Sequence, residues 1–336
     1  MRLRVGLVGL GDVWQLRHAP ALRALADRFE VRAICDQVGH RAEQAAAEFH
    51  AAAVDGYRVL AMREDIDAVL VLSPQWYGAL PILAACDAGK AVYCAAGLDL
   101  NAEEAQQIKR RVEEAGIAFV AEFPRRQAPA TIRLKELIAT RLAAPRLLFC
   151  HQRSVADPPA NSASGRPQQH PAARYLLEQV DWCRYVVDKE PTAVMGVVHR
   201  TSDGDDAEDY QMMSLDFSPR GKAGTGPVAQ ISCGRYIPSD WQEAISYRPL
   251  AALQVSCLRG IAFVDLPAAL VWFDEAGRHQ ESLDSERPVG EQLLTNFHRS
   301  VTSLLRKTCD LEDAYKAISV VQAARRSHAE GRRIEL

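Results

Sequence analysis

No two cysteines in this sequence stand in a C-x-x-C pair, although the chain contains eight of them. They lie mostly inside apolar runs such as Ala33–Cys35, and not in the close clusters that a zinc site needs. This pattern argues against both a metal centre and a disulfide framework. It predicts reduced, buried thiols in a reducing compartment, so we expect a cytoplasmic protein.

The chain also lacks an excess of charge of either sign. Its 40 basic and 43 acidic side chains leave a formal net charge of −3. The basic clusters, such as Lys109–Arg111, stand beside glutamates in helical patterns and are typical of solvated faces. We therefore expect no binding to nucleic acid or to an anionic membrane.

Long apolar runs are missing as well. No segment approaches the ~18 apolar residues that a membrane-spanning helix needs. Asp12 and Arg17 interrupt the region where a signal peptide would have its apolar core. The hydrophobic content of 48% is nevertheless enough for a sizeable core, and 336 residues suit two domains.

The first third of the chain alternates between short apolar runs and amphipathic stretches. Continuous apolar strands joined by helices are typical of a parallel sheet that is covered on both faces. Gly89 and Gly116 stand where helices should end, as C-cap glycines do. The expected strands are Leu3–Val8, Val31–Cys35, Ala68–Leu72, Ala91–Cys94 and Ile117–Val120.

Past Phe123 the pattern changes to helices followed by several strand-like segments. We expect a helix at 129–142, a strand at 146–152, a long loop at 154–172 and a helix at 171–187. Strands grouped after a helix favour an α+β domain with an open, mainly antiparallel sheet. The predicted domains are 1–122, a Rossmann-type α/β domain; 123–310, a substrate and oligomerisation domain; and 311–336, a C-terminal helix packing back on the first domain.

A dinucleotide-binding pattern follows the first strand. Gly9 and Gly11 lie between that strand and the first helix, where glycine allows a tight turn and a close approach to a pyrophosphate. Asp36 ends the second strand, and a carboxylate there hydrogen-bonds the adenosine ribose and disfavours a 2′-phosphate. The pattern predicts NAD as the cofactor and makes NADP the less favoured alternative.

The pattern departs from the full signature in two ways. Trp14 occupies the place of the third glycine, and Asp12 adds a negative charge close to the expected phosphates. A Rossmann-like domain that no longer holds a dinucleotide therefore remains an alternative.

The whole chain resembles the Gfo/Idh/MocA family of glucose-fructose oxidoreductase and inositol dehydrogenase relatives. The resemblance implies hydride transfer between NAD and a sugar, a polyol or a related small molecule, in a homodimer or homotetramer. It rests on Val5–Gly11 with His18, Val31–Asp36, Ile66–Val69 before Ser73-Pro74, Ala88–Cys94, Arg126-x-x-Pro129 and Arg259–Phe263.

The catalytic positions of that family are substituted. Where members usually carry Glu-Lys-Pro, Ala95–Gly97 reads Ala-Ala-Gly. The usual aspartate and histidine on the later helix correspond to Arg174 and Glu178, and Gly78 replaces a further histidine. Because alanine can neither carry charge nor transfer a proton, the ordinary mechanism lacks its lysine.

The residues that remain for catalysis are few. Glu178 could act as a general base, or it could form a structural ion pair with Arg174 one helical turn earlier. Tyr175 and Arg126 complete the candidate catalytic set, whereas His170 is expected to be an exposed loop residue. The candidate cofactor-binding residues are Gly9, Gly11, Asp12, Val13, Asp36, Ser73, Pro74 and Cys94, with Tyr93 and Cys94 near the nicotinamide.

Three functions are therefore compatible with the sequence. The first is an NAD-dependent oxidoreductase with an atypical active site. The second is a non-catalytic binding or scaffold protein that keeps the fold. The third is an NAD-assisted lyase or hydrolase.

Overall fold

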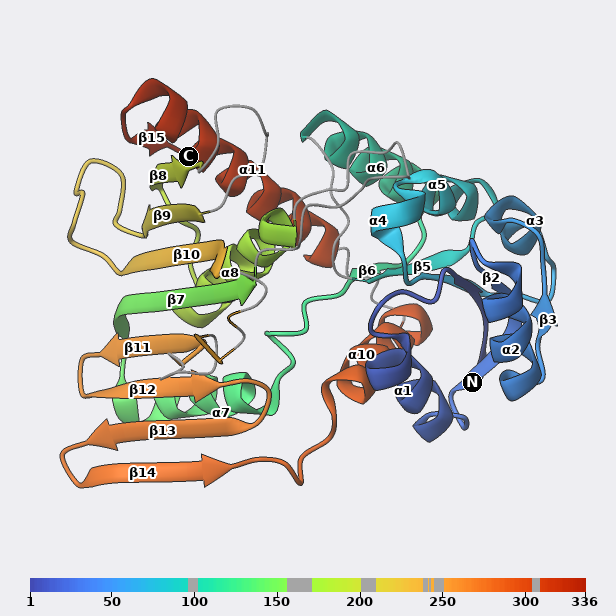
Figure 1. Cartoon of the computed structure of the whole chain (residues 1–336), viewed down its shortest axis with the longest axis horizontal. Coiled ribbons are helices and arrows are strands. Elements are labelled where there is room, and N and C mark those ends of the chain that lie inside the picture. The colour runs from blue at the N-terminus through green and yellow to red at the C-terminus, as the bar shows by residue number, and fades with distance from the viewer. Residues whose placement is uncertain are drawn as a thin grey trace. The chain divides into compact units, whose positions relative to one another are not determined.

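The computed structural model describes residues 1–95, 102–155, 171–200, 210–237, 241, 243–244, 251–303 and 309–336. Within these ranges the chain divides into two compact units (Figure 1). The first comprises Met1–Gln127 and Arg287–Lys316. The second comprises Ala128–Glu286 and Ala317–Leu336.

The first unit is built on a parallel sheet with the strand order β3-β2-β1-β4-β5-β6. This is the order of a Rossmann fold, in which the carboxyl ends of the strands form the ligand-binding edge. The predicted α/β architecture is confirmed. Its elements are β1 (Leu3–Val8), η1 (Trp14–His18), α1 (Ala19–Ala24), β2 (Phe29–Cys35), α2 (Gly39–Phe49), β3 (Ala52–Ala53), α3 (Tyr57–Ala61), β4 (Ala68–Val71), α4 (Pro74–Tyr77), α5 (Leu80–Asp87), β5 (Ala91–Cys94), α6 (Ala102–Ala115), β6 (Phe119–Ala121) and α10 (Val289–Thr302).

The second unit carries a mixed, mostly antiparallel sheet with the order β14-β13-β12-β11-β7-β10-β9-β8-β15. Only β7 and β10 pair in parallel, so the predicted open α+β sheet is also confirmed. Its elements are α7 (Pro129–Leu137), η2 (Ile138–Leu142), β7 (Pro145–Val155), α8 (Pro171–Val187), β8 (Ala193–His199), β9 (Tyr210–Asp216), β10 (Val228–Ile237), β11 (Leu253–Cys257), β12 (Gly260–Asp265), β13 (Ala269–Asp274), β14 (Gly277–Ser282), most of α11 (Cys309–Glu330) and β15 (Ile334–Glu335).

The two units differ from the domain boundaries expected from the sequence. Residues 287–310 group with the first unit, where α10 packs against α1, although they were expected in the second domain. Residues 317–336 group with the second unit, where β15 pairs with β8, although they were expected to pack on the first domain. The amphipathic pattern of a helix marks its buried face but not the sheet that covers it.

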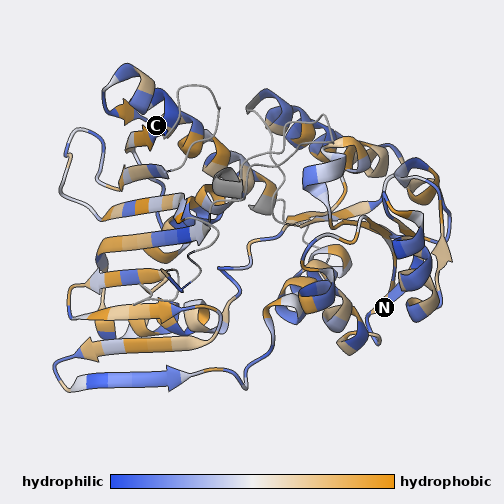
Figure 2. Cartoon of the chain, in the orientation of Figure 1, coloured by the Kyte–Doolittle hydropathy of each residue, from blue (hydrophilic) through white to orange (hydrophobic). Residues whose placement is uncertain are grey.

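One face of the second sheet is buried and the other is open. Along β9, buried Met213 and Leu215 alternate with half-buried Met212 and exposed Ser214. Helix α8 packs on β7 and β10 on the buried face. Figure 2 shows the contrast between apolar β13 and hydrophilic β14 at one edge of this sheet.

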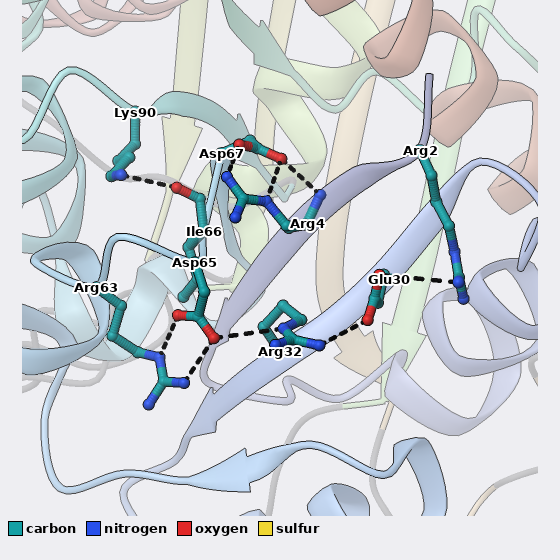
Figure 3. A network of polar contacts seen from close by, with 9 residues as sticks. All are labelled: Arg2, Arg4, Glu30, Arg32, Arg63, Asp65, Ile66, Asp67 and Lys90. Carbon is teal, nitrogen blue, oxygen red and sulfur yellow. Dashed lines mark hydrogen bonds and ion pairs between the residues drawn. The ribbon is translucent and has the colours of Figure 1, made fainter.

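An ion-pair network fixes the amino-terminal edge of the first sheet (Figure 3). Arg4 donates through its backbone N–H (2.9 Å) and guanidinium (2.6 and 3.1 Å) to the carboxylate of Asp67. Arg63 and Arg32 donate to Asp65 and lower its pKa to about 2. Because the network lies at the edge opposite the glycine loop, its role is structural.

Among the described residues, no helix has both the length and the apolar character that crossing a membrane requires.

Candidate dinucleotide site

The loop after β1 is packed so closely that two of its positions accept only glycine. Gly9 and Gly11 have φ angles of 70° and 63°, which L-residues with a side chain rarely adopt. A Cβ on Gly9 would stand 2.5 Å from Ser73 Cβ, and one on Gly11 would stand 2.3 Å from the carbonyl oxygen of Leu72. The backbone of the loop therefore lies directly against the carboxyl end of β4.

The helical segment after this loop begins with a π-helical turn, η1. Val13 precedes the turn, and the N–H groups of Arg17 and His18 both donate to its carbonyl. Trp14 is only 3% exposed and packs on Phe49, with ring centroids 5.7 Å apart. The indole is therefore a buried packing residue that contacts α2, whereas Asp12 is exposed.

Asp36 ties the ends of β1 and β2 together. Leu10 N–H donates to its Oδ2 at 2.8 Å, and Val38 N–H donates to its Oδ1 at 2.9 Å. Its side chain is 2% exposed, and Arg41 Nη1 lies 4.0 Å from Oδ1. Each carboxylate oxygen has a second lone pair, so the residue can still accept a ribose hydroxyl.

Ser73 and Pro74 stand at the same edge, where Pro74 begins the short helix α4. Tyr77 ends this helix and lies against Gly9. Burial raises the pKa of the Tyr77 hydroxyl, and its hydrogen bond with the thiol of Cys35 raises it further. Tyr57 meets the Tyr77 ring edge to face, with centroids 6.1 Å apart. Sequence reasoning missed both tyrosines, although each follows a strand end of the Rossmann pattern.

A buried charged cluster joins η1 to the segment that follows β6. Glu122 follows β6 and has a fully buried side chain. Arg17 forms an ion pair with its Oε1, and His18 Nε2 lies 3.2 Å from its Oε2. Burial raises the pKa of Glu122, but His18 and Arg17 outweigh that effect and bring it down to about 2. Sequence reasoning did not single out Glu122.

Cys94 and Tyr93, predicted near the nicotinamide, are both buried on β5. Burial raises the pKa of the Cys94 thiol far above its usual value, and the thiol donates to the carbonyl of Ala95 at 3.6 Å. Burial and the nearby Glu122 carboxylate raise the pKa of Tyr93. Cys94 is therefore a protonated packing residue in this structure, and Ala96 and Gly97 lie outside the described residues.

The candidate catalytic residues fall in different units. Arg126 belongs to the first, where its Nη1 donates to Asp313 at 2.9 Å and its guanidinium lies 4.7 Å from the Phe123 ring centroid. Tyr175 and Glu178 are partly buried on α8 in the second. The side chain of Arg174, the predicted partner of Glu178, is outside the described set, as are residues 156–170 with His170.

Comparison with known proteins agrees with this loop geometry. Residues 3–123 match the model of the GFO_IDH_MocA family, an oxidoreductase family with an NAD-binding Rossmann fold. The first unit therefore carries the NAD-binding Rossmann domain of this family. The chain is 29% identical to inositol 2-dehydrogenase of Cereibacter sphaeroides over 209 residues, which are 60% of this chain and 59% of that protein. The chain thus spans about three fifths of the length of that curated relative.

Solved structures of similar fold cover the whole chain. The aldose-aldose oxidoreductase of Caulobacter crescentus superposes with a TM-score of 0.84 at 16% identity, covering 100% of both chains. A levoglucosan dehydrogenase in complex with NADH and levoglucosan superposes with a TM-score of 0.83 at 18% identity. The superposition covers 100% of this chain and 99% of that one. At these identities the likeness establishes the fold of both units.

Proposed function

We propose that this Gfo/Idh/MocA-family protein is an oxidoreductase that binds NAD and acts on a sugar, a polyol or a related small molecule. The observation that carries the proposal is the glycine loop after β1. Its two positive φ angles place backbone without side chains at the ligand-binding edge of the sheet. The names of its relatives, inositol and levoglucosan dehydrogenases, support the substrate class. The nicotinamide would supply the hydride chemistry, and the chain would bind the cofactor and the substrate and orient them.

The cofactor preference proposed is NAD over NADP. Asp36 stands at the end of β2, where a Rossmann fold receives the adenosine ribose. Its carboxylate would repel a 2′-phosphate while accepting hydrogen bonds from ribose hydroxyls. Among the described residues, Arg41 forms an ion pair with that carboxylate, with its Nη1 4.0 Å from Oδ1.

For the chemical step we propose Glu178 as the general base, with Tyr175 and Arg126 contacting the substrate. Removing one acid–base group typically costs a rate factor of about 10²–10⁴. With alanine at position 96, we therefore expect slow turnover by the standards of an enzyme with a catalytic lysine. That same alanine favours the alternative of a non-catalytic binding protein, whereas no described contact favours a lyase or hydrolase.

The first test is titration with NADH, followed by nicotinamide fluorescence and by calorimetry. We expect a dissociation constant below ~100 μM, within the usual range for small ligands of enzymes. Asp36→Ala should weaken binding about 10-fold or more, because it removes the ribose acceptor and leaves the Leu10 and Val38 N–H groups unpaired. Asp27→Ala, a change of an exposed carboxylate, is the matched control. Failure of the wild-type protein to bind NADH would leave the non-catalytic alternative.

We also propose that the open face of the second sheet joins copies of this chain into a dimer or tetramer. Neighbouring strands place half-buried Phe263 beside Phe273, which is 37% exposed, with ring centroids 6.1 Å apart. Leu147, Met195 and Val197 are also exposed on strands of this sheet. Exposed apolar side chains on the open face of a sheet are typical of an interaction site.

Light scattering tests the interface. We expect the wild-type protein to have a mass of two or four chains and Phe273→Asp to shift the population toward monomer, because a buried, unpaired carboxylate opposes association. Leu258→Asp changes an exposed residue between β11 and β12 and should leave the mass unchanged. A monomeric wild-type protein would contradict the proposal.

A cytoplasmic location is proposed from the cysteines. Among the described residues, those at positions 35, 86, 94, 150, 183, 233 and 257 are buried and form no disulfide. Reduced thiols in such number are typical of a reducing compartment.

A further inference from the structure

Two tyrosines lie at the ligand-binding edge of the first sheet without a part in the proposed chemistry. Tyr57 begins α3, which follows β3, and Tyr77 ends α4, which follows β4. Their rings meet edge to face, with centroids 6.1 Å apart. Because the strand order is β3-β2-β1-β4, this contact reaches across the ends of β2 and β1. These are the two strands that Asp36 and the glycine loop follow.

Two contacts hold the Tyr77 ring in place. A Cβ on Gly9 would stand 3.0 Å from its Cε2, so the ring packs on the bare backbone of the glycine loop. Its hydroxyl is hydrogen-bonded to the thiol of Cys35, the last residue of β2. The N–H of Gly56, the residue before Tyr57, donates to the same thiol. The end of β2 therefore ties both tyrosines to one place.

This place adjoins the position proposed for the adenosine ribose. Cys35 immediately precedes Asp36, whose carboxylate is proposed to accept the ribose hydroxyls. The adenine base is bonded directly to that ribose, so it must lie beside it. Tyr57 and Tyr77 are half-buried, and part of each ring is accessible to a ligand. Proteins commonly bind a nucleic base by stacking it on an aromatic side chain.

The opposite half of the same edge offers a ligand less. At the ends of β5 and β6, Tyr93 is 0% exposed, Cys94 is 2% exposed, and the Glu122 carboxylate is held in its buried ion-pair cluster. Ala95, which follows β5, has no polar group in its side chain. Within the described part of the first unit, the ends of these two strands therefore present no polar side chain to a nicotinamide.

We propose that Tyr57 and Tyr77 form an aromatic wall for the adenine base, and that the site binds nucleotides through their adenosine diphosphate half. The inference rests on the proposed function for the place of the cofactor and names what the site recognises in it. The ligand class is adenosine diphosphate nucleotides with or without a nicotinamide, such as NADH, NAD⁺ and ADP-ribose. Binding should not distinguish NADH from NAD⁺, because the two differ only in the nicotinamide ring.

Calorimetric titration of the wild-type protein with the separate halves of the cofactor tests the proposal. ADP-ribose keeps the adenosine half and lacks the nicotinamide, whereas reduced nicotinamide mononucleotide is the opposite half. We expect NADH, NAD⁺ and ADP-ribose to have dissociation constants within about threefold of one another. The mononucleotide should bind at least ~100-fold more weakly, because it reaches neither the aromatic wall nor Asp36.

Variants of the wall identify the source of the affinity. Tyr57→Leu should weaken ADP-ribose binding about 10-fold, a loss typical of removing one base–aromatic stack, and Tyr77→Leu should do the same. Tyr77→Phe keeps the ring and removes only the hydroxyl, so it should bind ADP-ribose like the wild-type protein. Tyr236→Leu is the matched control, since it removes a ring that is 54% exposed on β10 of the second unit. Circular dichroism checks that each variant folds.

Binding of NADH without binding of ADP-ribose would overturn the proposal, because the nicotinamide half would then carry the affinity. Unchanged ADP-ribose binding by folded Tyr57→Leu and Tyr77→Leu would overturn it as well. Failure of the proposed function has a different signature. A protein that binds NADH and ADP-ribose alike but oxidises no sugar or polyol would keep the aromatic wall and would not be an oxidoreductase of that class.

Discussion

Glu122→Gln is expected to lower the free energy of unfolding by about 3 kcal/mol, a loss typical of breaking a buried ion pair by removing one partner. Glu122 is fully buried and contacts both Arg17 and His18. Glutamine would keep the shape of the side chain but leave the Arg17 guanidinium, 23% exposed, without a counter-charge. Urea denaturation at neutral pH, followed by circular dichroism, measures the change.

The pH dependence gives the same prediction an independent test. The pKa of Glu122 is lowered from 4.5 to about 2 in the folded protein, so its contribution to stability is complete above about pH 4.5. That contribution should disappear as the pH falls from about 4.5 to about 2, because protonation removes the charge that Arg17 and His18 hold. The variant lacks the ionisable group, so the wild-type and Glu122→Gln stability curves should converge over this interval.

Asp65 provides the control for burial. Its pKa is also lowered to about 2, by Arg63 and Arg32, but its side chain is 30% exposed at the edge of the sheet. Exposed ion pairs contribute about 0–1 kcal/mol because solvent screens them. Asp65→Asn should therefore cost less than about 1 kcal/mol. An equal loss of unfolding free energy in Asp65→Asn and Glu122→Gln would contradict the view that burial makes the Glu122 cluster contribute more to stability.

The elements best predicted from the sequence were those with a strong local signal. The strand Leu3–Val8 and the helix Pro171–Val187 have the expected bounds, because a continuous apolar run and an amphipathic period mark them directly. Strand β14 was missed. Its residues Gly277–Ser282 are polar, since it is an edge strand with little to bury.

The candidate site was predictable only where residues close in sequence form it. Gly9 and Gly11 lie in the expected loop, and Asp36 ends the expected strand. The contact between His18 and Glu122 joins residues 104 positions apart, which no local pattern encodes. The π-helical turn at Trp14 was also missed, because its residues have ordinary helical character and only the fold selects the wider turn.

Gly11→Ala is expected to weaken NADH binding about 100-fold. The added Cβ would stand 2.3 Å from the carbonyl oxygen of Leu72, and backbone atoms cannot rotate away as a flexible side chain can. The φ angle of 63° adds a strain of roughly 1–2 kcal/mol for a residue with a side chain. The loop must therefore move away from β4, which displaces the N–H groups available to the pyrophosphate.

Gly89→Ala separates the effect of close packing from that of backbone strain. Gly89 has a φ angle of 64°, almost the same as Gly11, but nothing lies within 4 Å of the position of its Cβ. In urea denaturation, this control should show a free energy of unfolding that is lowered by a similar amount of strain. It should bind NADH like the wild-type protein. If Gly11→Ala also bound NADH normally while remaining folded, the pyrophosphate would not be held by this loop. The glycines would then serve only the packing of β1 against β4.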